Sequence, residues 1–190
     1  MRLITFSGGL GCGKSTAIEA IKPWAQGQEI VLVKFAAHLY AIQEFIYGRI
    51  APVYPKPEGF VKDRVLLQWL GTDWGRSKDL NLWVKLWRAD VEAALARPNT
   101  IVVCDDVRFD NEAEIVKAMG GAVIRLERRD ARAAAVGGVG IKGHASEAGI
   151  DPQLIDYIVE NNSSLGDFQD SLSTLFSELG IGRDNDAEHA

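Results

Sequence analysis

The chain is poor in the residues that build disulfide frameworks and metal centres. It has two cysteines and three histidines among 190 residues, and no pair of them lies at a spacing typical of zinc ligands. This pattern excludes a small secreted domain stapled by disulfides and fits a reducing cytoplasm. No arrangement of serine, cysteine and histidine for covalent catalysis stands out either.

Long apolar runs and an excess of positive charge are also lacking. No apolar stretch approaches the ~20 residues that span a membrane, and Arg2 is followed by only a short apolar run, so neither an anchor nor a signal peptide is expected. The formal net charge of −5 disfavours a broad nucleic-acid-binding face. An apolar fraction of 47% and a charged fraction of 25% predict one globular domain over residues 1–190.

A glycine-rich stretch near the N-terminus is the strongest motif. Residues 8–16 read Gly-Gly-Leu-Gly-Cys-Gly-Lys-Ser-Thr, which fits G-x-x-x-x-G-K-[ST]. A strand pattern precedes it and a helical pattern follows, so the backbone N–H groups should point at phosphate oxygens. Lys14 would reach the β- and γ-phosphates and Ser15 would bind Mg²⁺. The residues expected to contact the nucleotide here are Gly9, Gly11, Cys12, Gly13, Lys14, Ser15 and Thr16.

Apolar runs alternate with amphipathic patterns along the rest of the chain. This order predicts an α/β fold of the phosphate-loop NTPase type, with about five parallel strands and helices on both faces. The run at 30–35 is apolar enough for a strand buried on both faces, whereas 71–76 is too glycine-rich and polar for a helix interior. Residues 183–190 should form a frayed tail. Strands are expected at 3–6, 30–35, 100–104, 122–126 and 156–161, and helices at 17–24, 36–47, 61–70, 82–95, 111–119 and 165–179.

Acidic and basic side chains follow the predicted third strand. Asp105 and Asp106 are placed to hold Mg²⁺ or to orient an attacking hydroxyl, with Asp105 favoured for the metal and Asp106 for the substrate. The alternative is a polar strand end that starts a turn. Arg108 is suited to bidentate phosphate binding, although a salt bridge to Asp110 or Glu112 fits the spacing equally well.

The densest positive cluster lies farther along the chain. Arg125, Arg128, Arg129 and Arg132 precede several glycines, which favours a mobile segment that brings cations to a phosphoryl group in transfer. A solvated helix face or a patch for an acidic partner is the alternative interpretation.

Four of the five tryptophans lie between positions 69 and 87. Trp69, Trp83 and Trp87 have helical spacing, so we expect them in the core. Trp74 lies beside glycines and is a candidate for stacking on a base, and Gln68 for hydrogen bonding to a base edge.

Together these motifs resemble the deoxynucleoside monophosphate kinases of tailed bacteriophages. The narrowest signals are Leu-Gly-Thr-Asp-Trp-Gly-Arg at residues 70–76 and Asp-Val-Arg-Phe-Asp-Asn-Glu at 106–112. The resembling stretches are collinear and cover about residues 1–180: 8–16, 34–36, 67–76, 106–112 with Gly120 and Gly121, the region of Arg128, 144–147 and 156–162.

The resemblance implies transfer of the γ-phosphoryl group of ATP to a deoxynucleoside monophosphate, with Mg²⁺. It implies a monophosphate-binding insert at 36–80, a closing lid at 128–147 and Asn161 near the adenine. It also implies a cytoplasmic enzyme of the host cell, without stable nucleic-acid or membrane partners; a homodimer stays open. The catalytic residues would be Lys14, Arg108, Asp106, Arg128, Arg129 and Arg132, and the substrate-binding residues Lys34, Gln68, Trp74, Arg76, Asp106, Arg108 and His144.

Two alternatives to this function remain. One is another small-molecule kinase on the same scaffold, such as a dephospho-coenzyme A kinase. The other is a switch or assembly protein that hydrolyses a nucleotide, although a guanine-selecting Asn-Lys-x-Asp stretch is absent.

Overall fold

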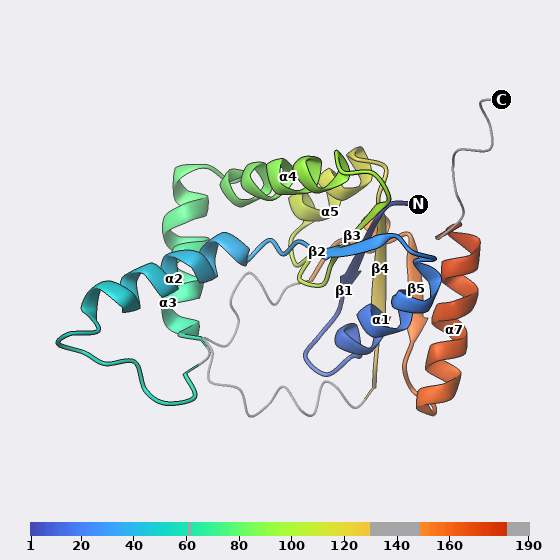
Figure 1. The fold of residues 1–190 in the computed structure, drawn as a ribbon, viewed down its shortest axis with the longest axis horizontal. Helices are drawn as coiled ribbons and strands as arrows, with labels where there is room; N and C mark the ends of the chain where they lie inside the picture. Colours follow the sequence, from blue (N-terminus) through green and yellow to red (C-terminus); the bar gives the residue numbers. More distant parts are fainter. Residues whose placement is uncertain (61, 130–148, 182–190) are drawn as a thin grey trace.

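The computed structural model describes residues 1–60, 62–129 and 149–181. Its centre is a sheet of five strands, all parallel, in the order β2-β3-β1-β4-β5 (Figure 1). The predicted parallel sheet is therefore confirmed. The strands are β1 (Leu3–Ser7), β2 (Glu29–Leu32), β3 (Thr100–Cys104), β4 (Ala122–Glu127) and β5 (Tyr157–Glu160).

Helices cover both faces of the sheet, because successive side chains of each buried strand point to opposite sides. Ile4 and Phe6 of β1 share one hydrophobic cluster with α1 and α7, and Leu3 shares the other with α4 and α5. Helices therefore bury both sides of the central strands. The helices concerned are α1 (Lys14–Ile21), which continues into the 3₁₀ turn η1 (Lys22–Trp24), α4 (Leu82–Leu95), α5 (Asp110–Ala118) and α7 (Leu165–Glu178).

The register aligns the carboxyl ends of the strands at one edge. Leu3 of β1 lies opposite Val102 of β3, and Ile4 lies opposite Ala122 of β4. The chain leaving β1 there enters the glycine-rich loop, and the chain leaving β3 enters Asp105. Ligands of open parallel sheets bind at this edge, so the fold brings the sequence motifs to one place.

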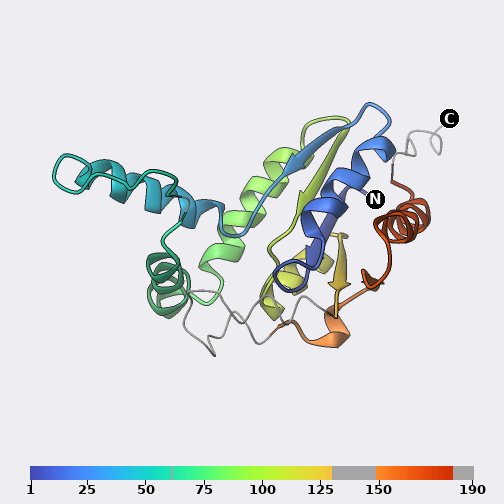
Figure 2. The same ribbon diagram turned by 90° about the horizontal axis from the view of Figure 1, so that it is seen from below.

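A helical insert projects sideways from the sheet between β2 and α4 (Figure 2). It consists of α2 (Ala37–Ile50), α3 (Arg64–Gln68) and η2 (Trp69–Arg76). Asp63 ties its two arms together: its carboxylate accepts hydrogen bonds from Leu66 N at 3.0 Å and from the Tyr47 hydroxyl at 2.9 Å. Its own N–H donates to Gln43 Oε1 at 2.7 Å.

Two expectations about local structure are wrong. Residues 71–76, predicted to be non-helical, belong to a π-helix that spans Trp69–Arg76, and Gly71 and Gly75 are buried in it against neighbouring side chains. A Cβ at Gly75 would lie 2.5 Å from the ring of Trp83, so the glycines serve packing. The strand at 30–35 is shorter than predicted, and it is not buried on both faces because β2 is an edge strand with Leu32 44% exposed.

The helical pattern over residues 82–95 also predicts that Leu82, Leu86, Val91 and Leu95 face inward, and this needs correction for Leu86. Leu86 is exposed, and the buried side chains are Trp83, Val84, Trp87, Val91 and Ala94. The indoles turn inward because each N–H finds a backbone acceptor: Trp83 Nε1 donates to Gly71 O at 2.8 Å and Trp87 Nε1 to Val33 O at 3.1 Å. The prediction of a core position is right for Trp83 and Trp87 and wrong for Trp69, which is 49% exposed.

The remaining element boundaries agree with the predictions to within a few residues, except that α2 runs through Gly48 to Ile50. Within the described part of the chain, none of the helices has the length and apolar character to cross a bilayer.

Trp87 gives a test of this core. It is fully buried, and its ring stacks on Phe35 with centroids 4.2 Å apart. We expect Trp87→Ala to lower the free energy of unfolding by about 3–5 kcal/mol through lost contacts and a cavity, measured by urea denaturation. Trp69→Ala is the matched control, with an expected loss below about 1 kcal/mol; equal losses would contradict the packing described.

Candidate active site

The glycine-rich loop between β1 and α1 has the backbone of a phosphate cradle. Gly8, Gly11 and Gly13 have φ of 132°, 76° and 110°, a region that residues with a Cβ rarely adopt. A Cβ at Gly13 would also lie 2.7 Å from Asn161 Nδ2 and 3.0 Å from the ring of Phe168. The loop is thus packed against the end of β5 and the start of α7.

Lys14 folds back over this loop. Its ammonium donates to Gly8 O at 2.7 Å and to Gly9 O at 2.8 Å, and lies 3.5 Å from the sulfur of Cys12. Cys12 is buried, whereas Ser15 is exposed and Thr16 is partly buried. The structure therefore places the predicted cation directly at the loop that would surround the phosphates.

Asn161 lies directly behind the phosphate loop. Its side-chain amide donates to Cys12 O at 3.0 Å, and its backbone N–H continues the pairing of the last strand by donating to Glu127 O at 2.7 Å. Asn161 thus supports the backbone of the phosphate loop, and its predicted place near the adenine of ATP stays a prediction.

Asp105 pairs with Lys34 at the end of β3. The two closest atoms are 3.0 Å apart, and the Asp105 side chain is 13% exposed. Burial opposes the charge on Lys34, but the hydrogen bond and charge of Asp105 outweigh it and raise the pKa of Lys34. The Oδ1 atom of Asp105 is buried and, despite the ion pair, has no hydrogen bond of good geometry.

The types of donor at Asp105 and Ser15 suit a magnesium ion. Mg²⁺ prefers oxygen ligands, keeps several waters and is often bound through one or two carboxylates together with substrate phosphates. Asp105 offers a buried oxygen without a hydrogen bond, and Ser15 an exposed hydroxyl. Over the ranges that the structure describes, no group of three or more His, Cys, Asp and Glu side chains forms an alternative metal centre.

Asp106 holds the start of the insert. Its two oxygens accept from Phe35 N at 2.9 Å and from Ala36 N at 3.0 Å, and the Cys104 thiol donates to Oδ1 at 3.2 Å. Burial raises the pKa of that thiol well above its usual value, which keeps it a donor. The carboxylate therefore serves α2 as a cap from another part of the chain.

Glu112 lies in a second junction, between the insert and α5. Its Oε1 accepts from Arg76 Nη2 at 2.8 Å, and its Oε2 accepts from the backbone N–H groups of Arg108 at 2.7 Å and Phe109 at 3.2 Å. Both partners of the ion pair are nearly buried, with 11% and 5% of their side chains exposed. The salt bridge expected for Arg108 is thus made by Arg76, which comes from 36 residues earlier.

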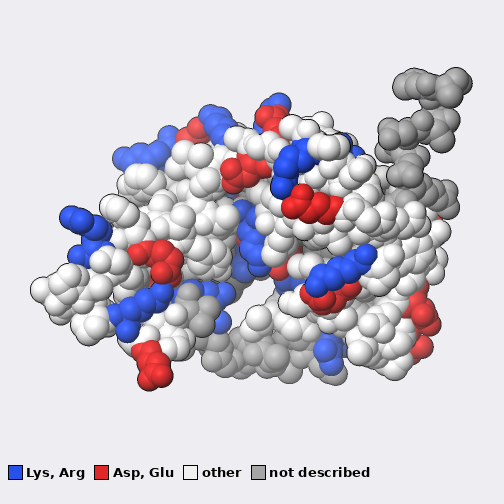
Figure 3. All heavy atoms as spheres, in the orientation of Figure 1, with Lys and Arg blue, Asp and Glu red and all other residues white. Residues whose placement is uncertain are grey.

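Of the predicted arginines of the second half that the structure describes, Arg125 is partly buried and pairs with Glu127 at 2.9 Å, and the others are exposed. Arg108, Arg128 and Arg129 are exposed, and Arg129 N donates to Asn162 Oδ1 at 2.8 Å. Arg132 and His144 lie outside the described residues, as does the proposed lid beyond residue 129. In Figure 3 the surface is hollowed between the insert and the part that holds the sheet, and Lys and Arg side chains gather there.

The candidate base-binding residues lie on the insert. Trp74 is 40% exposed, and Gln68 is partly buried, with no hydrogen bond to its Oε1 among the described residues. The ring of Trp74 is thus accessible to a ligand, whereas the Gln68 oxygen lacks a partner but is itself out of contact with solvent. Sequence reasoning missed Glu112 as a site residue; the available signal was an acid in the first turn of a predicted helix, which proves to be the third position of α5.

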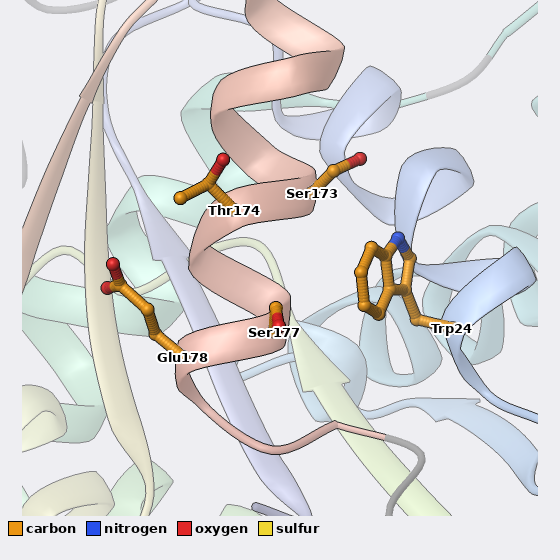
Figure 4. A pocket seen from close by; sticks show the side chains of 5 residues that line it. All are labelled: Trp24, Ser173, Thr174, Ser177 and Glu178. Carbon is orange, nitrogen blue, oxygen red and sulfur yellow. The ribbon is translucent and has the colours of Figure 1, made fainter.

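A second hollow, of about 630 Å³, lies elsewhere (Figure 4). It lies where η1 ends and α7 finishes, whereas α1 begins at the phosphate loop. None of the predicted site residues lines it, so we do not assign it to the active site. Its lining residues are Trp24, Ser173, Thr174, Ser177 and Glu178.

The close packing around Gly13 gives a prediction. Gly13→Ala combines an unfavourable φ with contacts that are too short, so we expect a loss of about 2 kcal/mol or more in unfolding free energy, together with loss of nucleotide binding. Gly9→Ala is the control in the same loop, because a Cβ there meets nothing within 4 Å; its stability should change by less than about 0.5 kcal/mol. If both variants unfold like the wild type, the tight loop geometry is wrong.

The environment of Glu112 gives a second prediction. Burial raises its pKa to about 7, against the opposing effects of the Arg108 N–H and the Arg76 charge; burial likewise lowers the pKa of Arg76, against the pull of Glu112. Between the unfolded value of 4.5 and about 7 the native state holds a proton that the unfolded chain has lost. This contribution to stability is therefore present below pH 4.5 and is lost as the pH rises to about 7.

The measurement is urea unfolding at pH 5 and pH 8 for the wild type and for Glu112→Gln. Other groups also titrate, so the informative quantity is how much more unfolding free energy the wild type loses between pH 5 and pH 8 than Glu112→Gln does. We expect this difference to be on the order of 1–3 kcal/mol. The same change in unfolding free energy for both proteins would show that Glu112 titrates normally.

Comparisons with known proteins agree with this geometry. The family model described as deoxynucleotide monophosphate kinase matches residues 61–172. A protein of Acanthamoeba polyphaga mimivirus named "Putative deoxynucleotide monophosphate kinase" is 32% identical over 146 residues, which cover 67% of this chain and 75% of the relative. Uncharacterized protein ORF77 of Ictalurid herpesvirus 1 (strain Auburn) is 28% identical over 172 residues, covering 90% and 69%.

Solved structures of low sequence identity share the fold. TT1252 from Thermus thermophilus superposes with a TM-score of 0.52 at 20% identity, covering 93% of this chain and 97% of its own. Dephospho-CoA kinase from Campylobacter jejuni gives a TM-score of 0.50 at 18% identity, covering 95% and 98%. The family model spans more than half of the chain, and the mimivirus relative is matched over two thirds of it. The chain therefore belongs to the deoxynucleotide monophosphate kinase family of phosphotransferases.

Proposed function

We propose that this protein transfers the γ-phosphoryl group of ATP to a deoxynucleoside monophosphate, which gives a deoxynucleoside diphosphate and ADP. The observation that carries the proposal is the arrangement at one sheet edge: a phosphate loop with Lys14 on one side, and Lys34 and Arg108 beside a helical insert on the other. A protein that only hydrolyses a nucleotide needs the first half, whereas a kinase needs both.

The donor half is formed by the phosphate loop. Lys14 would exchange its contacts with Gly8 O and Gly9 O for the β- and γ-phosphates of ATP, which offer stronger, charged acceptors. Ser15 and Asp105 would hold Mg²⁺, which neutralises phosphate charge when it is bound. Asn161 keeps the loop in shape through Cys12 O.

The acceptor half is formed by the insert, residues 36–80, within a single domain. Trp74 offers an exposed ring for stacking on the base, and Gln68 an unpaired oxygen for a base edge. Arg108 would bind the monophosphate, and Lys34 adds positive charge at the same edge. Asp106 contributes by holding Phe35 and Ala36, since both of its oxygens are engaged there.

Catalysis then consists of positioning and charge stabilisation. A phosphate oxygen of the acceptor attacks the γ-phosphorus, and the bond to the oxygen bridging the β- and γ-phosphorus atoms breaks. Lys14, Arg128 and Arg129, with Arg132 from the segment 128–147 that we assign as a lid, would offset the charge on the transferring group. No covalent enzyme intermediate is required.

One assay tests the proposal. ADP release from ATP is followed with no acceptor, with each deoxynucleoside and ribonucleoside monophosphate, and with dephospho-coenzyme A. We expect fast release only with one or more deoxynucleoside monophosphates. Release without an acceptor would indicate a nucleotide-hydrolysing protein, and release with dephospho-coenzyme A alone would indicate the other kinase.

Lys14→Ala tests the donor half. We expect a loss of at least about 10²-fold in kcat, because a cation at the developing phosphate charge is removed. Lys22→Ala, which removes an exposed lysine paired only with Glu19 on the surface, is the matched control and should retain full activity. An active Lys14→Ala enzyme would exclude the role assigned to the loop.

A further inference from the structure

Arg76 and Arg108 both come from family-like motifs, but their side chains are in opposite situations. The guanidinium of Arg76 donates to Glu112 Oε1 at 2.8 Å, to Asn111 Oδ1 at 3.1 Å and to Leu80 O at 3.3 Å. Its planar face lies 3.6 Å from the ring centroid of Phe109. Arg76 is therefore fully engaged within the protein.

Arg76 is poorly placed to bind a substrate phosphate directly. To reach a phosphate it would have to leave Glu112, whose side chain is only 5% exposed. A buried carboxylate without its cation is strongly disfavoured. The sequence-based assignment of Arg76 as a phosphate ligand therefore conflicts with the charge balance of this junction.

Arg108 is free for that task. Its side chain is exposed, and among the described residues no acceptor binds its guanidinium. Its backbone, in contrast, is held firmly, because Arg108 N donates to Glu112 Oε2 at 2.7 Å. The carboxylate of Glu112 thus joins two segments: one oxygen binds Arg76 at the end of η2, and the other binds the backbone of Arg108.

We propose that Glu112 is a positioning residue for the acceptor: through Arg76 it locks the insert to the 108–112 segment, so that Arg108 meets the acceptor phosphate at a set distance from Trp74. This inference rests on the proposed function and refines it. The insert would hold the base and Arg108 the phosphate, and Glu112 would fix the separation of the two. The distance between these two binding groups would therefore select an acceptor with the length of a nucleoside monophosphate.

Only a carboxylate of this length meets the requirement. Glutamine has one acceptor oxygen, so its NH₂ group would face either the guanidinium of Arg76 or the N–H groups of Arg108 and Phe109, donor against donor. Glu112→Gln therefore breaks one side of the junction while keeping the size of the side chain. Arg108→Met removes the proposed phosphate ligand without changing the backbone contact.

The test is a double-mutant cycle on kinase activity with the best acceptor of the wild-type enzyme. We expect Glu112→Gln to raise KM for the monophosphate about tenfold or more, as for a lost charge-assisted contact, and to leave KM for ATP within about twofold. Because Glu112 acts through Arg108, the double variant should have nearly the same kcat/KM for the acceptor as Arg108→Met alone.

A purely structural role would give a different result. Equal changes in both KM values, or losses that multiply in the double variant, would overturn the proposal. Glu92→Gln, which alters the exposed pair of Arg88 and Glu92 on α4, is the control and should change neither KM.

A milder variant covers poor folding of Glu112→Gln. Arg76→Lys keeps a cation beside Glu112 but loses the fork that also reaches Asn111. Arg76→Lys should raise KM for the monophosphate by a smaller factor than Glu112→Gln does, and KM for ATP should not change. An unchanged KM for the monophosphate would count against the proposal. If the wild type phosphorylates no monophosphate, the proposed function itself fails, which is a separate outcome.

Discussion

Three carboxylates follow β3 in largely buried positions, and each needs a hydrogen-bonding or charged partner there. Much of the site depends on this constraint. Asp105 pairs with Lys34, Asp106 with the N–H groups of Phe35 and Ala36, and Glu112 with Arg76. All three lie largely out of solvent, where an unpaired charge is costly. Each partner comes from the chain between β2 and α4, so pairing the charges also fixes the insert against the sheet.

The phosphate loop is held by a different kind of contact. No charge fixes it from behind; the neutral amide of Asn161 supports Cys12 O, and the rings and backbone of β4 and α7 approach Gly8 and Gly13 too closely for any side chain. Its one cation, Lys14, rests on carbonyl oxygens that a phosphate can replace. In the proposed donor half, packing fixes the backbone, while the cation can exchange its partners. In the proposed acceptor half, ion pairs hold the parts together.

Local patterns in the sequence were sufficient for most of the elements and for the position of the phosphate loop. The alternation of apolar runs predicts the parallel sheet, and residues 8–16 carry the loop in their spacing alone. The exposure of β2 was not predictable in this way, because strand order is a property of the whole sheet. The π-helical stretch was also missed, because Gly75 reads as a helix breaker until the ring of Trp83 is known to occupy its place.

The acceptor site was only partly predictable for a related reason. Spacing left two interpretations open for Arg108, phosphate binding or a salt bridge to Asp110 or Glu112, and gave no sign of a partner for Arg76. In the structure Arg76, which comes from 36 residues earlier, occupies the carboxylate of Glu112. Helical spacing predicted a core position equally for Trp69, Trp83 and Trp87, although within the described part of the chain only the last two find acceptors for their N–H groups. Long-range partners decide such cases, and they leave no local signal.

The buried pair of Arg76 and Glu112 is better explained by geometry than by stability. Burial pushes the pKa of both groups toward their neutral forms, so the ion pair is held against a desolvation cost. A well-packed apolar pair of similar size at such a place is often at least as stable. What an apolar pair lacks is direction: it cannot bind one guanidinium and two backbone N–H groups at once. In our proposal the junction must hold the exposed Arg108 in one position, which requires such directional contacts. Functional sites are commonly less stable than the best-packed alternative for this kind of reason.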